Sequence, residues 1–128
     1  MNAQDAIEVL AIVNFAVTGA SHLLQPQVWV EFFTKLRAQG RAGVFFVAFL
    51  SLGFGSLIVA FHPVWTGLPA ALTVFGWAQV AKGAAYFLFP GYALKKLAVV
   101  TPERAWMYRV AGGALLAFAA LLTWGLWS

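Results

Sequence analysis

Four long apolar segments, separated by prolines and clusters of charge, constrain this chain more than any other feature. They cover about residues 6–24, 42–61, 68–89 and 105–127, so each would form a helix roughly 28 to 35 Å long. That length matches the hydrocarbon core of a bilayer, in which a helix satisfies its own backbone hydrogen bonds. The sequence therefore predicts an all-α membrane protein: one domain, residues 1–128, with four transmembrane helices in a compact bundle.

The composition points to the same class. The chain is 62% hydrophobic and 9% charged, with a mean hydropathy of +0.84. Eight Lys and Arg residues and four Asp and Glu residues cannot cover the surface of a soluble domain of this size. These values exclude a disordered chain and a soluble enzyme, and the basic connections carry too little charge for a nucleic-acid surface.

The basic residues predict an orientation. Six of the eight lie in the connections after the first and third segments, namely Lys35, Arg37, Arg41, Lys95, Lys96 and Arg104. The positive-inside rule places these connections, residues 25–41 and 90–104, in the cytoplasm and both termini outside. We therefore expect a bacterial plasma (inner) membrane protein whose basic linkers lie along the inner leaflet and contact anionic lipid headgroups.

The two halves of the chain show a similar pattern, displaced by 64 positions. Residues 19–26 (GASHLLQP) align with residues 83–90 (GAAYFLFP), and in each half a basic amphipathic linker and a Gly-containing helix follow. Because both halves would enter the membrane from the same side, they would form parallel helical-hairpin repeats. Chance matching of common apolar residues is the alternative.

Polar residues form stripes on two of the expected helices. Helical spacing puts Asn14, Thr18, Ser21 and His22 on one face of the first segment, and Gln79, Lys82 and Tyr86 on one face of the third. If these faces meet, the amides of Asn14 and Gln79 would lie near mid-membrane. A second cluster would form in the cytoplasmic half, and it would consist of His22, Lys82, Tyr86 and Arg109.

Two interpretations of these stripes remain open. The first is packing, since Asn, Thr and Ser commonly bond across membrane helices, and Asn14, Thr18 and Ser21 are candidates for such contacts. The second is a binding site for a substrate or lipid, because ionisable groups inside a span are functional candidates by default. The candidate residues for that site are His22, Gln79, Lys82, Tyr86 and Arg109.

The remaining polar and aromatic groups receive simpler interpretations. We expect Glu8 to reach water at the outer interface and His62, which precedes Pro63 in a turn, to be solvated. The two histidines lie a membrane thickness apart, which excludes a haem between them, and no cysteine is present. We therefore expect no metal site and no cofactor. Trp77, near the middle of the third segment, is expected to fill a helix-packing interface.

One short motif carries a resemblance. The segment GASHLLQP at residues 19–26, with its amphipathic linker and Gly-containing return helix, resembles the start of DoxX-like small bacterial membrane proteins. The resemblance covers about the first half of the chain, and no function is carried over from it.

No Ser/His/Asp, Cys/His or phosphate-loop motif is present, so no catalytic residue is assigned. The leading hypothesis is a small, non-enzymatic accessory or structural membrane protein that binds lipid or a larger membrane complex. The alternative is a homo-oligomeric transporter or channel for a small anionic or amphipathic substrate. A membrane enzyme acting on lipid or quinone comes third.

Overall fold

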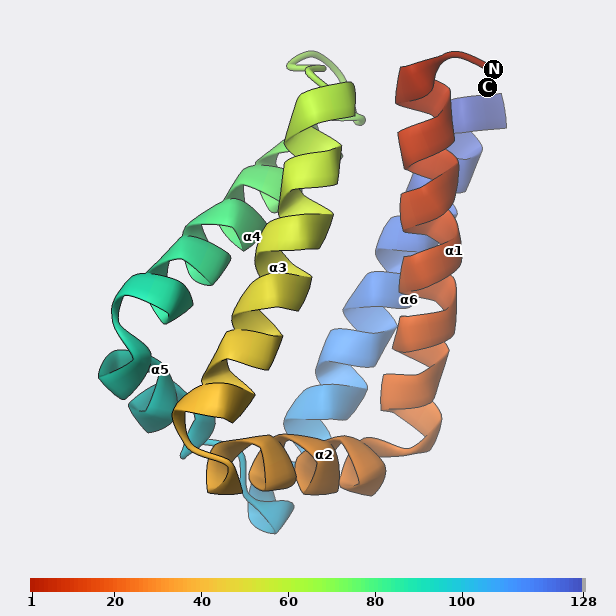
Figure 1. Ribbon diagram of the computed structural model, residues 1–128. Coiled ribbons are helices and arrows are strands. Elements are labelled where there is room, and N and C mark those ends of the chain that lie inside the picture. Colours follow the sequence, from red (N-terminus) through yellow and green to blue (C-terminus); the bar gives the residue numbers. More distant parts are fainter. Residues whose placement is uncertain (128) are drawn as a thin grey trace.

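The structure, a computed structural model, describes residues 1–127, and all regular secondary structure in this part is helical (Figure 1). Six α-helices and a short 3-10 helix account for nearly all of it, with no strand among these residues. The elements are α1 (Ala3–Leu24), α2 (Pro26–Ala38), α3 (Arg41–Phe61), α4 (Ala70–Leu88), α5 (Pro90–Leu97), η1 (Pro102–Arg104) and α6 (Trp106–Trp127).

Three helical segments are long and apolar enough to cross a membrane. They are Ala3–Leu24, Arg41–Phe61 and Pro102–Trp127, the last of which contains α6. The remaining long helix, α4, has 19 residues and would measure about 28 Å. It carries Gln79 and Lys82, which lower its hydropathy. Three of the four expected spans are therefore supported by length and composition, which suggests a membrane protein.

The two basic linkers begin as helices. Pro26 and Pro90 occupy the first turns of α2 and α5, where the missing backbone N–H of proline costs least. The preceding residues, Gln25 and Phe89, have nearly the same backbone conformation, with φ of −133° and −131°. In Figure 1, α2 runs across one end of the long helices, which is the end opposite to the chain termini.

The long helices associate as two tight pairs, α1 with α6 and α3 with α4 (Figure 1). In the first pair, a Cβ atom built on Gly112 would lie 2.6 Å from the carbonyl oxygen of Gly19. In the second pair, a Cβ on Gly55 would lie 2.7 Å from the carbonyl oxygen of Gly76. Backbone therefore touches backbone within each pair, as small residues allow in membrane helices.

The two pairs meet in an apolar core that includes residues from all four long helices. Its buried members are Ile7, Ala11, Phe15, Ile58, Leu72, Ala119 and Leu122. The ring of Phe15 lies at its centre, with centroids 5.0 Å from Phe75 and 5.3 Å from Phe118. This core, rather than a direct backbone contact, joins α1 and α6 to α3 and α4.

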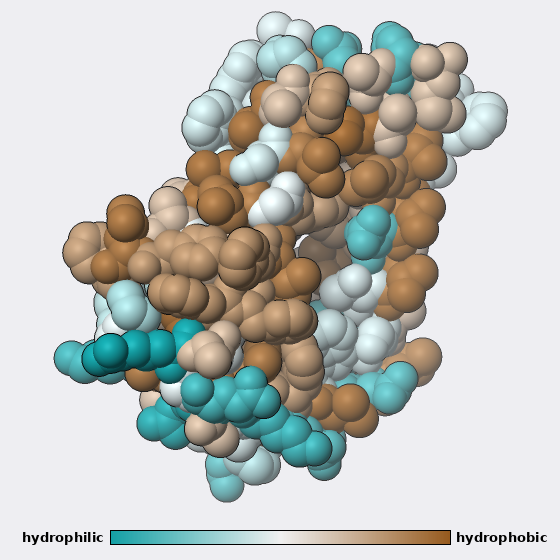
Figure 2. Space-filling model, viewed as in Figure 1, coloured by the Kyte–Doolittle hydropathy of each residue, from teal (hydrophilic) through white to brown (hydrophobic). Residues whose placement is uncertain are grey.

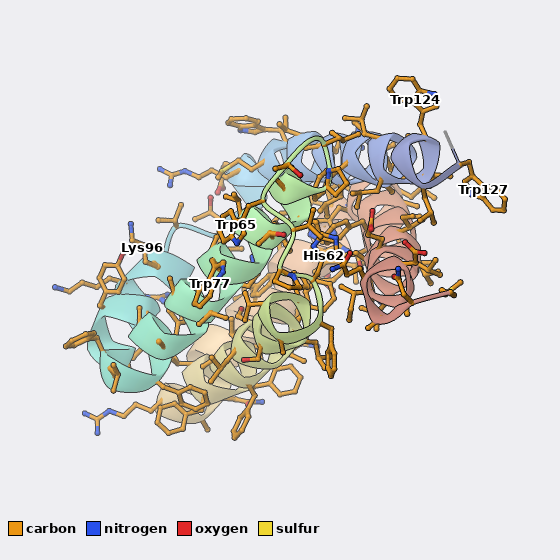
Figure 3. The ribbon with its side chains drawn as sticks, turned by 90° about the horizontal axis from the view of Figure 1, so that it is seen from above. His62, Trp65, Trp77, Lys96, Trp124 and Trp127 are labelled. Atoms are coloured by element: carbon orange, nitrogen blue, oxygen red, sulfur yellow. The ribbon has the colours of Figure 1, made fainter. Side chains whose placement is uncertain are left out.

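Five of the six tryptophans are exposed, including one that was expected inside the bundle. Trp77 is 51% exposed on α4, so the expectation that it fills a packing interface is wrong. In Figure 3, Trp124 and Trp127 project from the end of α6. An exposed indole on an apolar helix is suited to lipid contact. In Figure 2, hydrophobic residues cover much of the middle of the molecule, and hydrophilic ones gather at its lower end.

Adjacent glycines on α6 offer a direct test of the first pair. Gly112→Ala would place a methyl group against backbone, whereas a Cβ on Gly113 meets nothing within 4 Å. We expect Gly112→Ala to destabilise the protein by about 1–3 kcal/mol through overpacking. The measurement is unfolding in detergent micelles. Gly113→Ala, the matched control, should leave stability unchanged or raise it; equal effects of both changes would contradict the close contact.

Candidate functional site: a polar-walled cavity between the helix pairs

A cavity of about 430 Å³ lies between the two helix pairs. Most of its wall is apolar, and it opens to the surface; the space-filling view in Figure 2 shows a hollow between the two sides of the molecule. The lining residues come from five helices: Asn14, Phe15, Thr18, Trp29, Phe32, Phe33, Val47, Leu50, Ser51, Phe54, Phe75, Gln79, Lys82 and Leu115. An aromatic cavity with a few polar groups is typical of a site for an apolar or amphipathic ligand.

The polar residues of the wall come from opposite sides of the cavity. Asn14 and Thr18 belong to α1, and Gln79 and Lys82 belong to α4. Asn14 donates a hydrogen bond through Nδ2 to the carbonyl oxygen of Leu10, 2.8 Å away, so this bond stays within its own helix. Asn14 and Thr18 thus line one cavity with Gln79 and Lys82, and no hydrogen bond joins the first two residues to the other two.

Lys82 has no anionic partner. Within residues 1–127 its ammonium group makes no hydrogen bond and no ion pair. Its Nζ lies 5.7 Å from the centroid of the Tyr86 ring, one turn further along α4. Tyr86 in turn packs against the small apolar cluster of Val44, Ala93 and Leu97. A cation–π contact offsets only part of the cost of holding an ammonium group among apolar helices.

Trp29 of α2 closes one side of the cavity. Its Nε1 donates a hydrogen bond to Ser21 Oγ at 2.9 Å, which fixes α2 to the end of α1. Its ring lies 4.1 Å, centroid to centroid, from that of His22. Ser21 therefore makes a contact between helices, although its partner is the interfacial helix α2 rather than another long helix.

His22 and Arg109 lie outside this cavity. The Nδ1 of His22 is 2.8 Å from the carbonyl oxygen of Thr18, so that nitrogen carries the hydrogen. His22 lines a separate space of about 210 Å³ together with Tyr108 and Arg104. Arg109 lines a groove beside Pro26 and Trp106. Of the five candidate residues, Gln79 and Lys82 line the cavity, His22 and Arg109 line two other spaces, and Tyr86 lines none of the three.

Sequence reasoning missed the contribution of Trp29 to this cavity. Periodicity reveals which face of a helix is polar, but it does not show where a connecting helix folds. The sequence did contain one signal for this contact. Pro26 lies between Ser21 and Trp29, and a proline at the start of a new helix redirects the chain.

A second polar cluster lies in the bundle near the chain termini, and it overturns two expectations. His62 is completely buried, and Glu8 is 7% exposed, so neither is solvated. Their Nε2 and Oε2 atoms are 3.4 Å apart. His62 Nδ1 also lies 2.9 Å from the hydroxyl of Thr73, at the start of α4. Figure 3 shows His62 among the helices rather than in an exposed turn.

The physical reason is the path of the α3–α4 connection. His62 ends α3 with its backbone N–H bonded to Ile58, and the Thr73 hydroxyl lies within hydrogen-bond distance of the carbonyl oxygens of His62 and Val64. These bonds pull the beginning of the connection back over the end of the bundle. A turn position next to proline therefore does not by itself place a histidine in water.

In the part of the chain that the structure describes, no group of three or more His, Asp or Glu side chains could hold a metal ion. Comparison with protein-family models, with curated proteins and with solved structures finds no match to the chain.

The bond between Trp29 and Ser21 can be tested by its effect on α2. Ser21→Ala removes the acceptor and should lower stability by about 1 kcal/mol. We expect faster amide hydrogen exchange in α2, measured by mass spectrometry, with α3 unchanged. Ser56→Ala, at an exposed position of α3, is the control. Unchanged exchange in α2 of the Ser21→Ala variant would show that α2 is held by its apolar contacts alone.

Proposed function

We propose that the chain is a four-span protein of a bacterial plasma membrane, with α4 as the additional span. This assignment is supported by the pairing of α4 with α3, because Gly55 and Gly76, which both lie in the interior of their helices, meet in a close contact. A helix of about 28 Å can cross a hydrocarbon core of about 30 Å with slight local thinning. The termini would lie outside, with α2 and α5 along the cytoplasmic leaflet.

We also propose that the halves are parallel repeats. A long helix, a short helix that begins with proline and a second long helix follow one another twice along the chain. The two short helices begin at Pro26 and Pro90, 64 positions apart. The first long helix of each half packs on the second long helix of the other half. An axis along the membrane normal would relate two such units.

The function that this architecture supports best is binding of a lipid, or of a comparable amphiphile with an anionic headgroup. The observation that carries it is the cavity between the pairs, which is lined by aromatic rings and by Lys82, whose ammonium group has no anionic partner among the described residues. Acyl chains would lie against Phe15, Phe54 and Phe75. The headgroup would accept hydrogen bonds from Lys82 and the Gln79 amide.

The residues of the cavity wall can bind a lipid without converting it chemically. A lipid headgroup would supply the counter-charge that the chain does not provide, so ligand and site would be stabilised together. The cavity wall contains no nucleophile paired with a base, which favours an accessory or structural protein over an enzyme. The same cavity could serve a homo-oligomeric transporter, and flux measurements separate the two roles.

The lysine gives the test. Lys82→Met keeps the length of the side chain and removes its charge, and we expect lipid binding to weaken by roughly ten- to a hundredfold, as for loss of a hydrogen bond to a charged group. Native mass spectrometry of protein released from nanodiscs of mixed zwitterionic and anionic phospholipid would measure retained lipid. Lys82→Arg, which keeps the positive charge at this position, is the control.

If both variants retain as much anionic lipid as the parent protein, lipid binding in the cavity is excluded. Liposomes reconstituted with the protein provide the second readout. Uptake of an anionic solute that depends on Lys82 would favour the transporter, and lipid retention without flux would favour the accessory role.

The topology has its own test, helped by the absence of native cysteine. Single substitutions Gln39→Cys, Thr66→Cys and Glu103→Cys sample three connections. With four spans, an impermeant maleimide should label Thr66→Cys in intact cells and the other two only after permeabilisation. If α4 does not cross the membrane, positions 66 and 103 would be labelled from the same side.

A further inference from the structure

The buried cluster of Glu8, His62 and Thr73 is not used by the cavity. It lies at the end of the bundle where α3 meets α4, and it is formed by three helical elements. Ile7 and Leu72, which flank Glu8 and Thr73 in the chain, belong to the apolar core. An ion or hydrogen-bonding group in such surroundings is costly unless it is paired.

The hydroxyl of Thr73 determines where the hydrogen sits on His62. A threonine has one hydrogen to donate, and Thr73 Oγ1 lies 2.6 Å from the carbonyl oxygen of Val64 and 2.9 Å from that of His62. A carbonyl can only accept, so the hydroxyl hydrogen is directed to these oxygens. The contact of 2.9 Å with His62 Nδ1 is then a bond in which Nδ1–H donates to Oγ1.

The other nitrogen of the ring therefore faces Glu8 with no hydrogen of its own unless the ring is charged. Nε2 is buried without a hydrogen-bond partner, and the carboxylate oxygen Oε2 of Glu8 is 3.4 Å away. A neutral Nδ1–H imidazole beside an ionised carboxylate would bring two lone pairs together. One proton between them removes this repulsion, whether it resides on the ring or on the carboxyl group.

We propose that Glu8 and His62 together form a proton-binding site that joins α1 to the α3–α4 pair. Its electrostatic surroundings are simple: in the outer turns of α1, α3, α4 and α6, Asp5 is the only other ionisable side chain among the described residues. It lies on α1, one turn before Glu8. No basic side chain from α4 or α6 is available there to replace the proton.

The site makes the contact between the helix pairs dependent on pH. With one proton bound, Nε2 and Oε2 attract each other, and the pairs are held together at this end. When the pH rises far enough to remove that proton, the two atoms repel, so separation of the pairs becomes more favourable. The inference does not depend on lipid binding.

Nitrogen NMR of the ring gives the first test, since the chain has two histidines and His22→Asn assigns the remaining signal to His62. In detergent micelles, ¹⁵N shifts distinguish the imidazolium and the two neutral tautomers. We expect His62 as imidazolium or as the Nδ1–H tautomer at every pH at which the protein is folded. A neutral ring with hydrogen on Nε2 would overturn the proposal.

Glu8→Gln removes the acidic group that would share the proton and keeps the size of the side chain. The Gln amide can donate to Nε2, so the protein should remain folded with His62 neutral and the hydrogen on Nδ1. We expect the thermal unfolding midpoint of the parent protein to fall relative to that of Glu8→Gln as pH rises from 5 to 9. Glu31→Gln, an exposed carboxylate on α2, should behave as the parent.

A parent protein and a Glu8→Gln variant with the same pH dependence would exclude the shared proton. If Glu8→Gln fails to fold, the NMR measurement on the protein with Glu8 in place still decides the tautomer. Failure of lipid binding in the Lys82→Met experiment would leave both results untouched, because Lys82 lies on the cavity wall and not in this cluster.

Discussion

Close backbone contact within two helix pairs determines the rest of the molecule. At Gly19, Gly112 and Gly55, a side chain as small as a methyl group would meet a neighbouring main chain, and at Gly76 it would meet the side chain of Ile58. Aromatic side chains such as Phe15 and Phe75 lie away from these glycine contacts. They gather between the pairs, where aromatic rings form both the apolar core and much of the wall of the cavity.

The linkers decide which end of this second interface is open. Pro26 begins α2 directly after α1, and the bond from Trp29 to Ser21 holds α2 across the end of the long helices that lies opposite the chain termini. The indole of Trp29 lines the cavity and also packs against the ring of His22. A linker first understood as a carrier of positive charge thus also shapes the cavity, since its apolar face is turned toward the long helices.

Sequence reasoning predicts the features that depend on helical periodicity, and it fails for the features that depend on the path of the chain between helices. The expected segments differ from the helices by at most three residues at each end, because apolar length and prolines define them. The polar faces with Asn14 and Gln79 follow from helical spacing in the same way. His62 and Trp77 do not: a connection that folds back buried the histidine, and the rotation of α4 exposed the indole.

The interface between the pairs therefore has two regions that differ in charge balance, the Glu8–His62 cluster and the cavity that contains Lys82. In the first region, charge is balanced inside the chain, because Glu8 faces His62 and a single proton can satisfy both. In the second, Lys82 faces a cavity without a counter-ion. A bundle stabilised only by packing would have no need of an unpaired ammonium group, which an apolar residue could replace at lower cost. The imbalance at Lys82 is thus the strongest physical argument that something other than the chain completes this region.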